Sequence, residues 1–278
     1  MTNSDTPRVA LLGGTKMPVL GFGTWPLKNA EAERAVATAV ELGYRLVDTA
    51  FAYGNERGVG NGLAASGISR AEVFVTTKFN REWHGVTKVR ESVEGSLEKL
   101  KLDYVDLLLV HWPNPAQGKY VDAWEGMLQL RADGLIKAAG TSNFKPAHID
   151  QLLAATSQAP EVNQIELSPL VTRTGPREYH ARHSIVTQSW SPLGAGNELL
   201  TLPVIQDIAK RHDKSAAQVV LRWHIQSGFS TIPKTRTPAR MKENLDIFEF
   251  QLTDADMQAL DELDQGEEAA TDSDEFGH

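Results

Sequence analysis

The sequence predicts an α/β protein with the architecture of a (β/α)8 TIM barrel, in which eight parallel strands form a closed ring surrounded by helices. Eight short apolar runs rich in β-forming residues alternate with segments of helical period, and no proline- or serine-rich linker divides the chain. Eight such units in 278 residues favour a closed barrel over a doubly wound open sheet, the competing architecture. We therefore expect residues 1–278 to form a single barrel domain.

The elements follow in a regular order along the chain. Residues 8–20 predict a small hairpin that turns at Gly13 and Gly14 before the first barrel strand. In the first helical segment, Val36 and Val40 share an apolar stripe and Gly43 ends the helix. The expected strands are residues 19–25, 44–50, 72–79, 103–112, 135–143, 161–167, 184–190 and 229–235. The clearest helical segments are residues 30–43, 87–100, 121–134, 146–156, 202–214 and 215–228.

Composition and charge narrow the class of function. The formal net charge is −8, with both signs spread along the chain, so nothing indicates a nucleic-acid or membrane-surface partner. There is no cysteine, which excludes disulfide and thiolate chemistry. The first residues resemble no signal peptide and no stretch reaches transmembrane length, so we expect a cytoplasmic protein. Residues 266–278 are small and acidic, and we expect them to form a solvated tail.

Polar or aromatic residues stand at the carboxyl ends of the expected strands. A barrel strand should be apolar until that end, where the loops between strands and helices form the active site. Each residue alone has a structural interpretation, such as helix capping, but the barrel gathers all these ends at one mouth. The strand-end residues are Asp48, Lys78, His111, Asn143, Gln164, Trp190 and Lys234.

Four side chains at this mouth suit proton delivery to a carbonyl group. Tyr53 follows Asp48 by five residues, and a tyrosine has a reference pKa of about 10. The ammonium of Lys78 should lower that pKa, and Asp48 should keep Lys78 charged and oriented. His111 can donate a hydrogen bond to a carbonyl oxygen. The set suits protonation of an alkoxide as it forms from a carbonyl, which leaves a hydride donor as the missing component.

Longer motifs extend the pattern over nearly the whole chain. They are GYRLVDTAFAYGNERGVG, TTK, DYVDLLLVHWP, GTSNF, VNQIELSP, SWSPL and IPKTRTPARMKEN. With them the chain resembles the aldo-keto reductase superfamily, and within it the bacterial 2,5-diketo-D-gluconate reductases and their relatives. The resemblance implies a monomeric oxidoreductase that uses NADPH to reduce aldehydes, ketones or dicarbonyl compounds, keto-sugar acids among them.

The resemblance also implies roles for individual residues. Asp48, Tyr53, Lys78 and His111 match the catalytic tetrad, with Tyr53 as the general acid in reduction. Trp190 would stack on the nicotinamide, and Thr24 and Asp48 would approach its ribose. The nicotinamide carboxamide would be bound by Ser142, Asn143 and Gln164. The pyrophosphate would be bound by Ser191, Pro192 and Leu193.

Residues 232–240, IPKTRTPAR, have a physical interpretation of their own. Lys234, Arg236 and Arg240 place three cations at a strand end and a helix start, with the hydroxyl of Thr235, as a 2′-phosphate requires. Arg236 replaces an apolar residue common in the family and should strengthen the preference for NADP. By resemblance, Glu243 and Asn244 would contact the adenine.

The substrate side of the site departs from the family pattern. Many relatives have Lys-Leu-Trp after the third strand, whereas this chain has Lys78, Phe79 and Asn80, and places Trp83 three residues further on. Ser168 likewise replaces a common histidine near the mouth. We expect an aromatic wall around the substrate, built with His111 from Trp25, Phe51 and Trp112.

Two other functions compete with reduction. A barrel lyase would use Lys78 to form a Schiff base, but would leave Asp48, Tyr53 and the basic segment without roles. A cofactor-binding regulatory protein would not require all four tetrad side chains. A metal site at His180 and His183 is disfavoured because no third ligand accompanies them.

Overall fold

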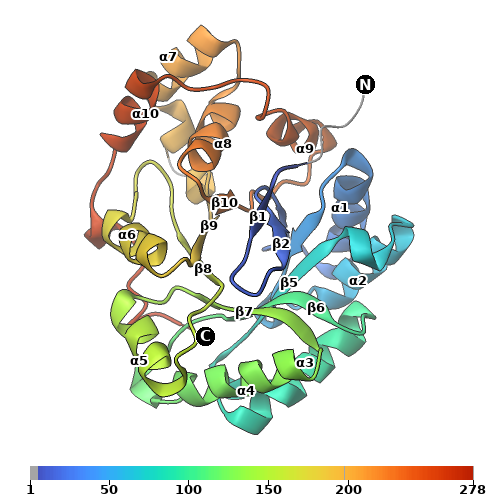
Figure 1. Cartoon of the computed structure of the whole chain (residues 1–278). Coiled ribbons are helices and arrows are strands. Elements are labelled where there is room, and N and C mark those ends of the chain that lie inside the picture. The colour runs from blue at the N-terminus through green and yellow to red at the C-terminus, as the bar shows by residue number, and fades with distance from the viewer. Residues whose placement is uncertain (1–5, 197, 278) are drawn as a thin grey trace.

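The computed structural model describes residues 6–196 and 198–277, in which eight parallel strands surround a barrel interior (Figure 1). The strands follow one another around the sheet in chain order, from β3 to β10. All eight expected strands are confirmed, each shorter than its apolar run. They are β3 (Phe22–Gly23), β4 (Leu46–Asp48), β5 (Phe74–Phe79), β6 (Val105–Val110), β7 (Ile136–Ser142), β8 (Val162–Glu166), β9 (Val186–Trp190) and β10 (Ser230–Thr231).

The barrel closes where the first strand segment meets the last. Leu20 and Thr231 form a parallel bridge, and the Gly21 amide donates to the Thr231 carbonyl at 2.8 Å. A Cβ on Gly23 would lie 2.7 Å from the carbonyl oxygen of Ile232, so this close approach requires glycine. The glycines of the GFGTW segment therefore serve the closure of the barrel.

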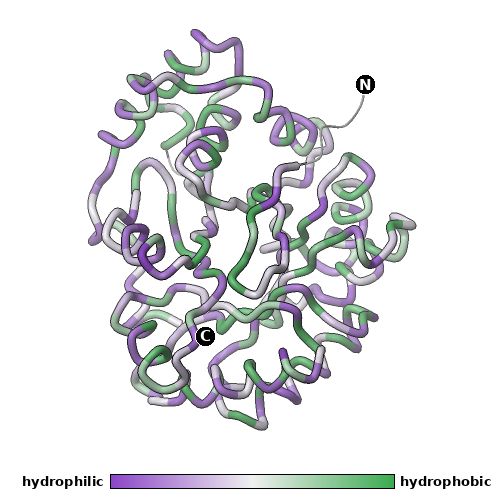
Figure 2. The backbone as a smooth tube through the Cα atoms, viewed as in Figure 1, coloured by the Kyte–Doolittle hydropathy of each residue, from purple (hydrophilic) through white to green (hydrophobic). Residues whose placement is uncertain are grey.

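The helices form the outer layer of the molecule (Figure 1). Figure 2 shows hydrophobic and hydrophilic residues alternating around their turns, as expected when one side of each helix packs on the sheet. Gly43 ends the first helix at φ 115°, a left-handed conformation that favours glycine. The helices are α1 (Asn29–Leu42), α2 (Glu56–Ala65), α3 (Val86–Leu100), α4 (Tyr120–Ala132), α5 (Pro146–Thr156), α6 (Thr174–Arg182), α7 (Pro203–His212), α8 (Ala216–Gln226), α9 (Pro238–Leu245) and α10 (Asp254–Asp261).

The predicted N-terminal hairpin is confirmed and covers one end of the barrel. Strands β1 (Arg8–Ala10) and β2 (Lys16–Pro18) pair antiparallel, and the turn places Gly14 at φ 86°. Met17 is fully buried in a cluster with Leu46 and Phe74, the first residues of β4 and β5. The hairpin therefore covers the amino ends of the strands and leaves the carboxyl ends as the mouth.

The tail was only partly predicted. Most of its side chains are exposed, as expected, but the C-terminal segment (residues 266–277) is bound to the barrel. Its Thr271 amide donates to the Glu166 carboxylate at 2.9 Å, and Ser273 is buried. The red segment passes from α10 along α6 towards α5 in Figure 1.

Within the described chain, no helix combines the length and the apolar character needed to cross a bilayer.

Candidate active site

The functional side chains occupy the last inward-facing positions of the strands. Alternate residues of a strand face the same side of the sheet. Asp48 lies two residues after Leu46 on β4, Lys78 lies four after Phe74 on β5, and His111 continues the inward series of β6. The same period that fills the barrel with apolar side chains therefore brings three polar ones to its mouth. The apolar cluster below them includes Leu46, Phe74, Leu107, Leu109, Val162 and Ile232.

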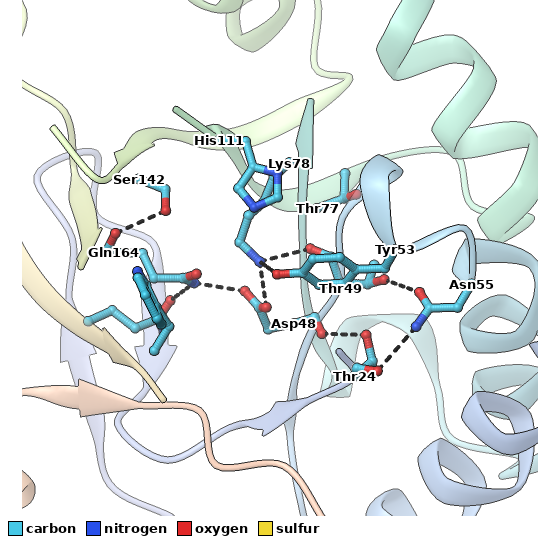
Figure 3. A network of polar contacts seen from close by, with 12 residues as sticks. Thr24, Asp48, Thr49, Tyr53, Asn55, Thr77, Lys78, His111, Ser142 and Gln164 are labelled. Carbon is cyan, nitrogen blue, oxygen red and sulfur yellow. Dashed lines mark hydrogen bonds and ion pairs between the residues drawn. The ribbon is translucent and has the colours of Figure 1, made fainter. Parts of the chain in front are cut away.

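Lys78 lies at the centre of a buried polar network (Figure 3). Its Nζ donates to Asp48 Oδ1 at 2.6 Å, to the Thr49 carbonyl at 3.1 Å and to Tyr53 Oη at 3.2 Å. Tyr53 reaches this position from a 3₁₀ turn, Phe51–Tyr53, that follows β4 and ends at Gly54 with φ 64°. Three donor positions of the ammonium are thus used, and one of them connects Lys78 to the phenol.

The electrostatics correct one prediction. Burial raises the pKa of Tyr53 above its usual value, and the opposing effect of the Lys78 ammonium does not outweigh it. The ammonium therefore has the predicted lowering effect, but the net pKa is raised, because sequence spacing does not show that the phenol is removed from water. Burial alone would lower the pKa of Lys78, but Asp48 and Tyr53 raise it. At neutral pH the site therefore holds a protonated phenol beside a charged ammonium, and a charged, buried lysine is unsuited to Schiff-base formation.

The second oxygen of Asp48 is held by a chain of amides. Gln164 Nε2 donates to Asp48 Oδ2 at 2.8 Å and to Gln188 Oε1 at 2.7 Å. Gln188 in turn donates to Ser230 Oγ at 3.0 Å. Gln188 was not predicted, although a glutamine in the middle of an expected barrel strand is a signal of a buried polar network.

His111 lies beside the phenol and is oriented from both sides. Its ring is 5.8 Å from the Tyr53 ring, centroid to centroid, in an edge-on arrangement. Its Nδ1 lies 3.3 Å from Asn80 Oδ1, and its carbonyl accepts from Asn143 Nδ2 at 3.0 Å. Asn80, which departs from the family pattern, therefore contacts the imidazole directly.

The predicted nicotinamide residues meet on the opposite side of the mouth. Trp190 Nε1 donates to Asn143 Oδ1 at 2.8 Å, and Ser142 Oγ donates to the Gln164 carbonyl at 3.0 Å. Asn143 adopts φ 64°, a left-handed conformation that asparagine tolerates better than most residues. The structure thus brings Ser142, Asn143, Gln164 and Trp190 together.

Thr24 and Asn55 fasten the loop that carries Tyr53. Thr24 Oγ1 donates to the Asp48 carbonyl at 2.9 Å. Asn55 precedes α2, but its side chain makes no capping bond; it donates to the carbonyls of Thr24 and Leu27 instead. Asn55, at the N-cap position of α2, therefore ties the Tyr53 loop to the loop after β3.

One cavity of about 800 Å³ opens at this mouth. A second cavity of about 340 Å³ adjoins it, and Leu193, Lys234 and Arg240 line both. The predicted cofactor residues in the first cavity are Thr24, Asp48, Ser142, Asn143, Gln164, Trp190, Ser191, Pro192, Leu193, Lys234 and Arg240. Those in the second are Leu193, Lys234, Thr235, Arg240, Glu243 and Asn244.

Three predicted residues line neither cavity: Lys78, which is buried and bonded to Asp48 and Tyr53, and also Arg236 and Phe51. Arg236 is largely exposed and forms an ion pair with Glu31 at 3.1 Å. Phe51 packs edge-on against Trp83 at 5.8 Å and lies under the ammonium of Lys99, so it does not reach the substrate side. Trp83 packs against Phe51 in the same contact and does not line the first cavity. Tyr53 and the predicted substrate residues Trp25, His111 and Trp112 do line the first cavity.

The outer wall of the first cavity was not predicted either. Thr271 and Phe276 of the C-terminal segment line it, as do Leu200 and Ile232. The aromatic ring of Phe276 within an otherwise acidic tail was the available signal, since a free tail has no need of a phenylalanine.

His180 and His183 are engaged by the protein. The two ring nitrogens of His180 contact Asn163 Nδ2 and Thr187 Oγ1, each at 2.9 Å. His183 stacks on Tyr179. Over residues 6–196 and 198–277, no three His, Asp or Glu side chains gather in the way a metal ion requires.

Comparison with known proteins identifies the family. The model of the aldo/keto reductase family matches residues 19–265. This chain belongs to the aldo/keto reductase family. An aldo-keto reductase of Mycolicibacterium vanbaalenii is 47% identical over 94% of this chain and 93% of its own length. Methylglyoxal reductase DkgA of Escherichia coli K12 is 44% identical over 97% of this chain and 98% of its own.

Solved structures of aldo-keto reductases share the fold. Gox0644 without ligand superposes with a TM-score of 0.92 at 41% identity, over 96% of this chain and 97% of that one. A mutant of Gox0644 in complex with NADPH gives 0.93 at 40% identity, over 98% of both chains. With its family, this protein is an NADPH-dependent oxidoreductase that reduces carbonyl compounds. The two adjoining cavities, with cations at the junction, fit such a cofactor.

Proposed function

We propose that this aldo-keto reductase reduces small dicarbonyl compounds of the methylglyoxal type and that Tyr53 provides the proton. The observation that carries the proposal is the 3.2 Å hydrogen bond between Lys78 Nζ and Tyr53 Oη at the cavity wall. The name of the DkgA relative, at 44% identity, supports the substrate class. Keto-sugar acids are the alternative substrates to test. We further propose that residues 1–278 form one domain and act as a cytoplasmic monomer without a nucleic-acid partner.

The proposed mechanism follows from the charges around Tyr53. NADPH supplies the hydride when bound, with Lys234, Thr235 and Arg240 as the proposed ligands of its 2′-phosphate. As the carbonyl oxygen gains negative charge, Tyr53 Oη transfers its proton to it. The attraction between Lys78 and the oxygen of Tyr53 grows as the phenolate develops, so Lys78 stabilises the transition state more than the ground state.

Asp48 and His111 have supporting roles in this proposal. Asp48 keeps the ammonium charged, since the pair is buried and its bond measures 2.6 Å. His111 orients the carbonyl oxygen towards Tyr53, because its ring borders both the phenol and the cavity. Trp190, Ser142, Asn143 and Gln164 are the proposed nicotinamide contacts.

The test is NADPH consumption with methylglyoxal, simple aldehydes and keto-sugar acids, for wild type beside Tyr53→Phe. We expect the highest kcat/KM with the dicarbonyl and a loss of about 10²- to 10⁴-fold in kcat for the variant. Equal rates for the two proteins would refute the role of Tyr53. Turnover of keto-sugar acids alone would refute the substrate class, and binding of NADPH without any turnover would favour a regulatory role.

A further inference from the structure

The C-terminal segment carries two aspartates to the same lysine. Lys145 Nζ donates to Asp272 Oδ1 at 2.6 Å and to Asp274 Oδ2 at 2.5 Å. Lys145 directly precedes α5, so the partial positive charge of that helix end also favours the two carboxylates. These contacts join parts of the chain that are more than 120 residues apart.

His148 adds a fourth member to this arrangement. Its Nδ1 accepts from the Lys145 amide at 3.1 Å, which places the ring hydrogen on Nε2. That Nε2 lies 2.9 Å from Asp274 Oδ1 and donates to it. We call the set of Lys145, His148, Asp272 and Asp274 the clasp.

The clasp is connected to the active site through a short turn. The Phe276 amide donates to the Asp272 carbonyl at 2.9 Å, and the Asp274 amide donates to Asp272 Oδ1 at 2.9 Å. Two residues beyond Asp274, the Phe276 ring meets Trp112 edge-on, with centroids 4.9 Å apart. Both rings line the first cavity, and Trp112 directly follows His111.

We propose that Lys145, with His148, is a positioning element for substrate selection, because it holds Asp272 and Asp274 so that Phe276 completes an aromatic wall with Trp112. This inference rests on the proposed reduction of small dicarbonyl compounds. In this proposal the position of the aromatic wall depends on the clasp, an ion cluster at the start of α5 that is remote from the reacting atoms. Without Lys145 the two aspartates and the neighbouring Glu275 repel one another, and the segment loses its anchor.

The chain offers a matched control for this ion cluster. Arg90 on α3 also lies between two carboxylates, Glu94 and Asp133, and is exposed to a similar degree. It contacts neither the C-terminal segment nor the cavity. Arg90→Ala therefore removes a comparable surface cation without touching the proposed wall.

The kinetic test compares phenylglyoxal, whose ring can reach the wall, with methylglyoxal, whose methyl group is too short. At saturating NADPH, Lys145→Ala should raise the KM for phenylglyoxal roughly five- to tenfold. Its kcat and its KM for methylglyoxal should stay within about twofold of wild type. Lys145→Arg should restore most of the loss, and Arg90→Ala should behave as wild type.

A double-mutant cycle tests whether Lys145 acts through Phe276. In a Phe276→Ala background, Lys145→Ala should have no further effect on the KM for phenylglyoxal. Raising the salt concentration from about 0.05 M to about 0.5 M should weaken phenylglyoxal binding in wild type and leave Lys145→Ala unchanged. Equal effects of Lys145→Ala in both backgrounds would overturn the proposal.

Hydrogen exchange tests the clasp without any turnover. Amides of residues 270–277 should exchange faster in Lys145→Ala than in wild type or Arg90→Ala. Unchanged exchange would overturn the clasp even if the enzyme reduces both substrates. If wild type reduced neither compound while exchange rose as expected, the proposed substrate class would fail and the clasp would stand.

Discussion

The inner ring of the mouth and its outer rim are held in different ways. In the inner ring, Asp48, Lys78 and Gln164 come from three strands and are almost wholly buried, and each bonds directly to another. At the rim, Phe276 is half-exposed and is placed by aspartates that are themselves half-exposed. The proposed proton delivery is therefore protected from solvent and salt, whereas the proposed substrate selection rests on contacts that solvent can reach.

The largest expected effect comes from breaking the inner ring. Lys78→Met leaves the Asp48 carboxylate buried without its cation, so the free energy of unfolding should fall by about 3–5 kcal/mol. Urea unfolding of wild type and variant measures this loss. In Asp48→Asn with Lys78→Met, most of the stability should return, since no charge remains buried. A double variant as unstable as the single one would show that the pair is not the cause.

The cofactor end gives the next largest effect. Arg240 and Lys234 line both cavities, so Arg240→Ala should raise the KM for NADPH about ten- to hundredfold through loss of a charge-assisted bond. The KM for NADH, which lacks the 2′-phosphate, should change by less than about threefold. Steady-state kinetics with both cofactors decides the matter, and equal changes would exclude Arg240 as a phosphate ligand.

Buried histidine should make the barrel itself sensitive to acid. Burial lowers the pKa of His180 to about 3, whereas an unfolded histidine titrates near 6.5. The unfolded chain therefore binds the extra proton, and stability falls as the pH decreases from about 6.5 towards 3. At pH 5, protonation of His180 in the unfolded chain should lower the free energy of unfolding by about 2 kcal/mol. Stability curves of His180→Gln should show a shallower decline, and parallel curves would contradict this origin.

The smallest effect is expected from the exposed pair of Arg236 and Glu31. Because Glu31 holds Arg236 outside both cavities, Arg236→Ala should raise the KM for NADPH by only about twofold. Glu31→Gln should lower that KM slightly by releasing the guanidinium. An effect of Arg236→Ala as large as that of Arg240→Ala would mean that Arg236 leaves Glu31 when the cofactor binds.

The sequence was most informative where the barrel's own periodicity sets the position of a side chain. Asp48, Lys78 and His111 could be predicted because each lies within one residue of the carboxyl end of its strand, and these ends converge whatever the loops do. The strands themselves were predicted too long, most of all at the closure, where residues 19–23 and 231–233 are joined by three backbone hydrogen bonds rather than by a continuous ladder.

The other features of the site depend on tertiary contacts that the sequence pattern does not encode. Phe51 was expected in an aromatic wall around the substrate, but one turn of 3₁₀ helix directs its ring to Trp83. Arg236 was expected at the phosphate, yet a carboxylate more than 200 residues away in sequence binds it. The pKa of Tyr53 required its burial to be known, and the position of Phe276 required the clasp.

The most direct test of the contrast between the inner ring and the outer rim measures kcat/KM for methylglyoxal and phenylglyoxal. The proteins compared are wild type, Tyr53→Phe and Phe276→Ala. We predict that Tyr53→Phe lowers both values by a similar factor of about 10²–10⁴ and leaves their ratio unchanged. Phe276→Ala should change the ratio while sparing methylglyoxal. A Tyr53→Phe enzyme that kept wild-type rates, or a Phe276→Ala enzyme that lost both substrates equally, would contradict it.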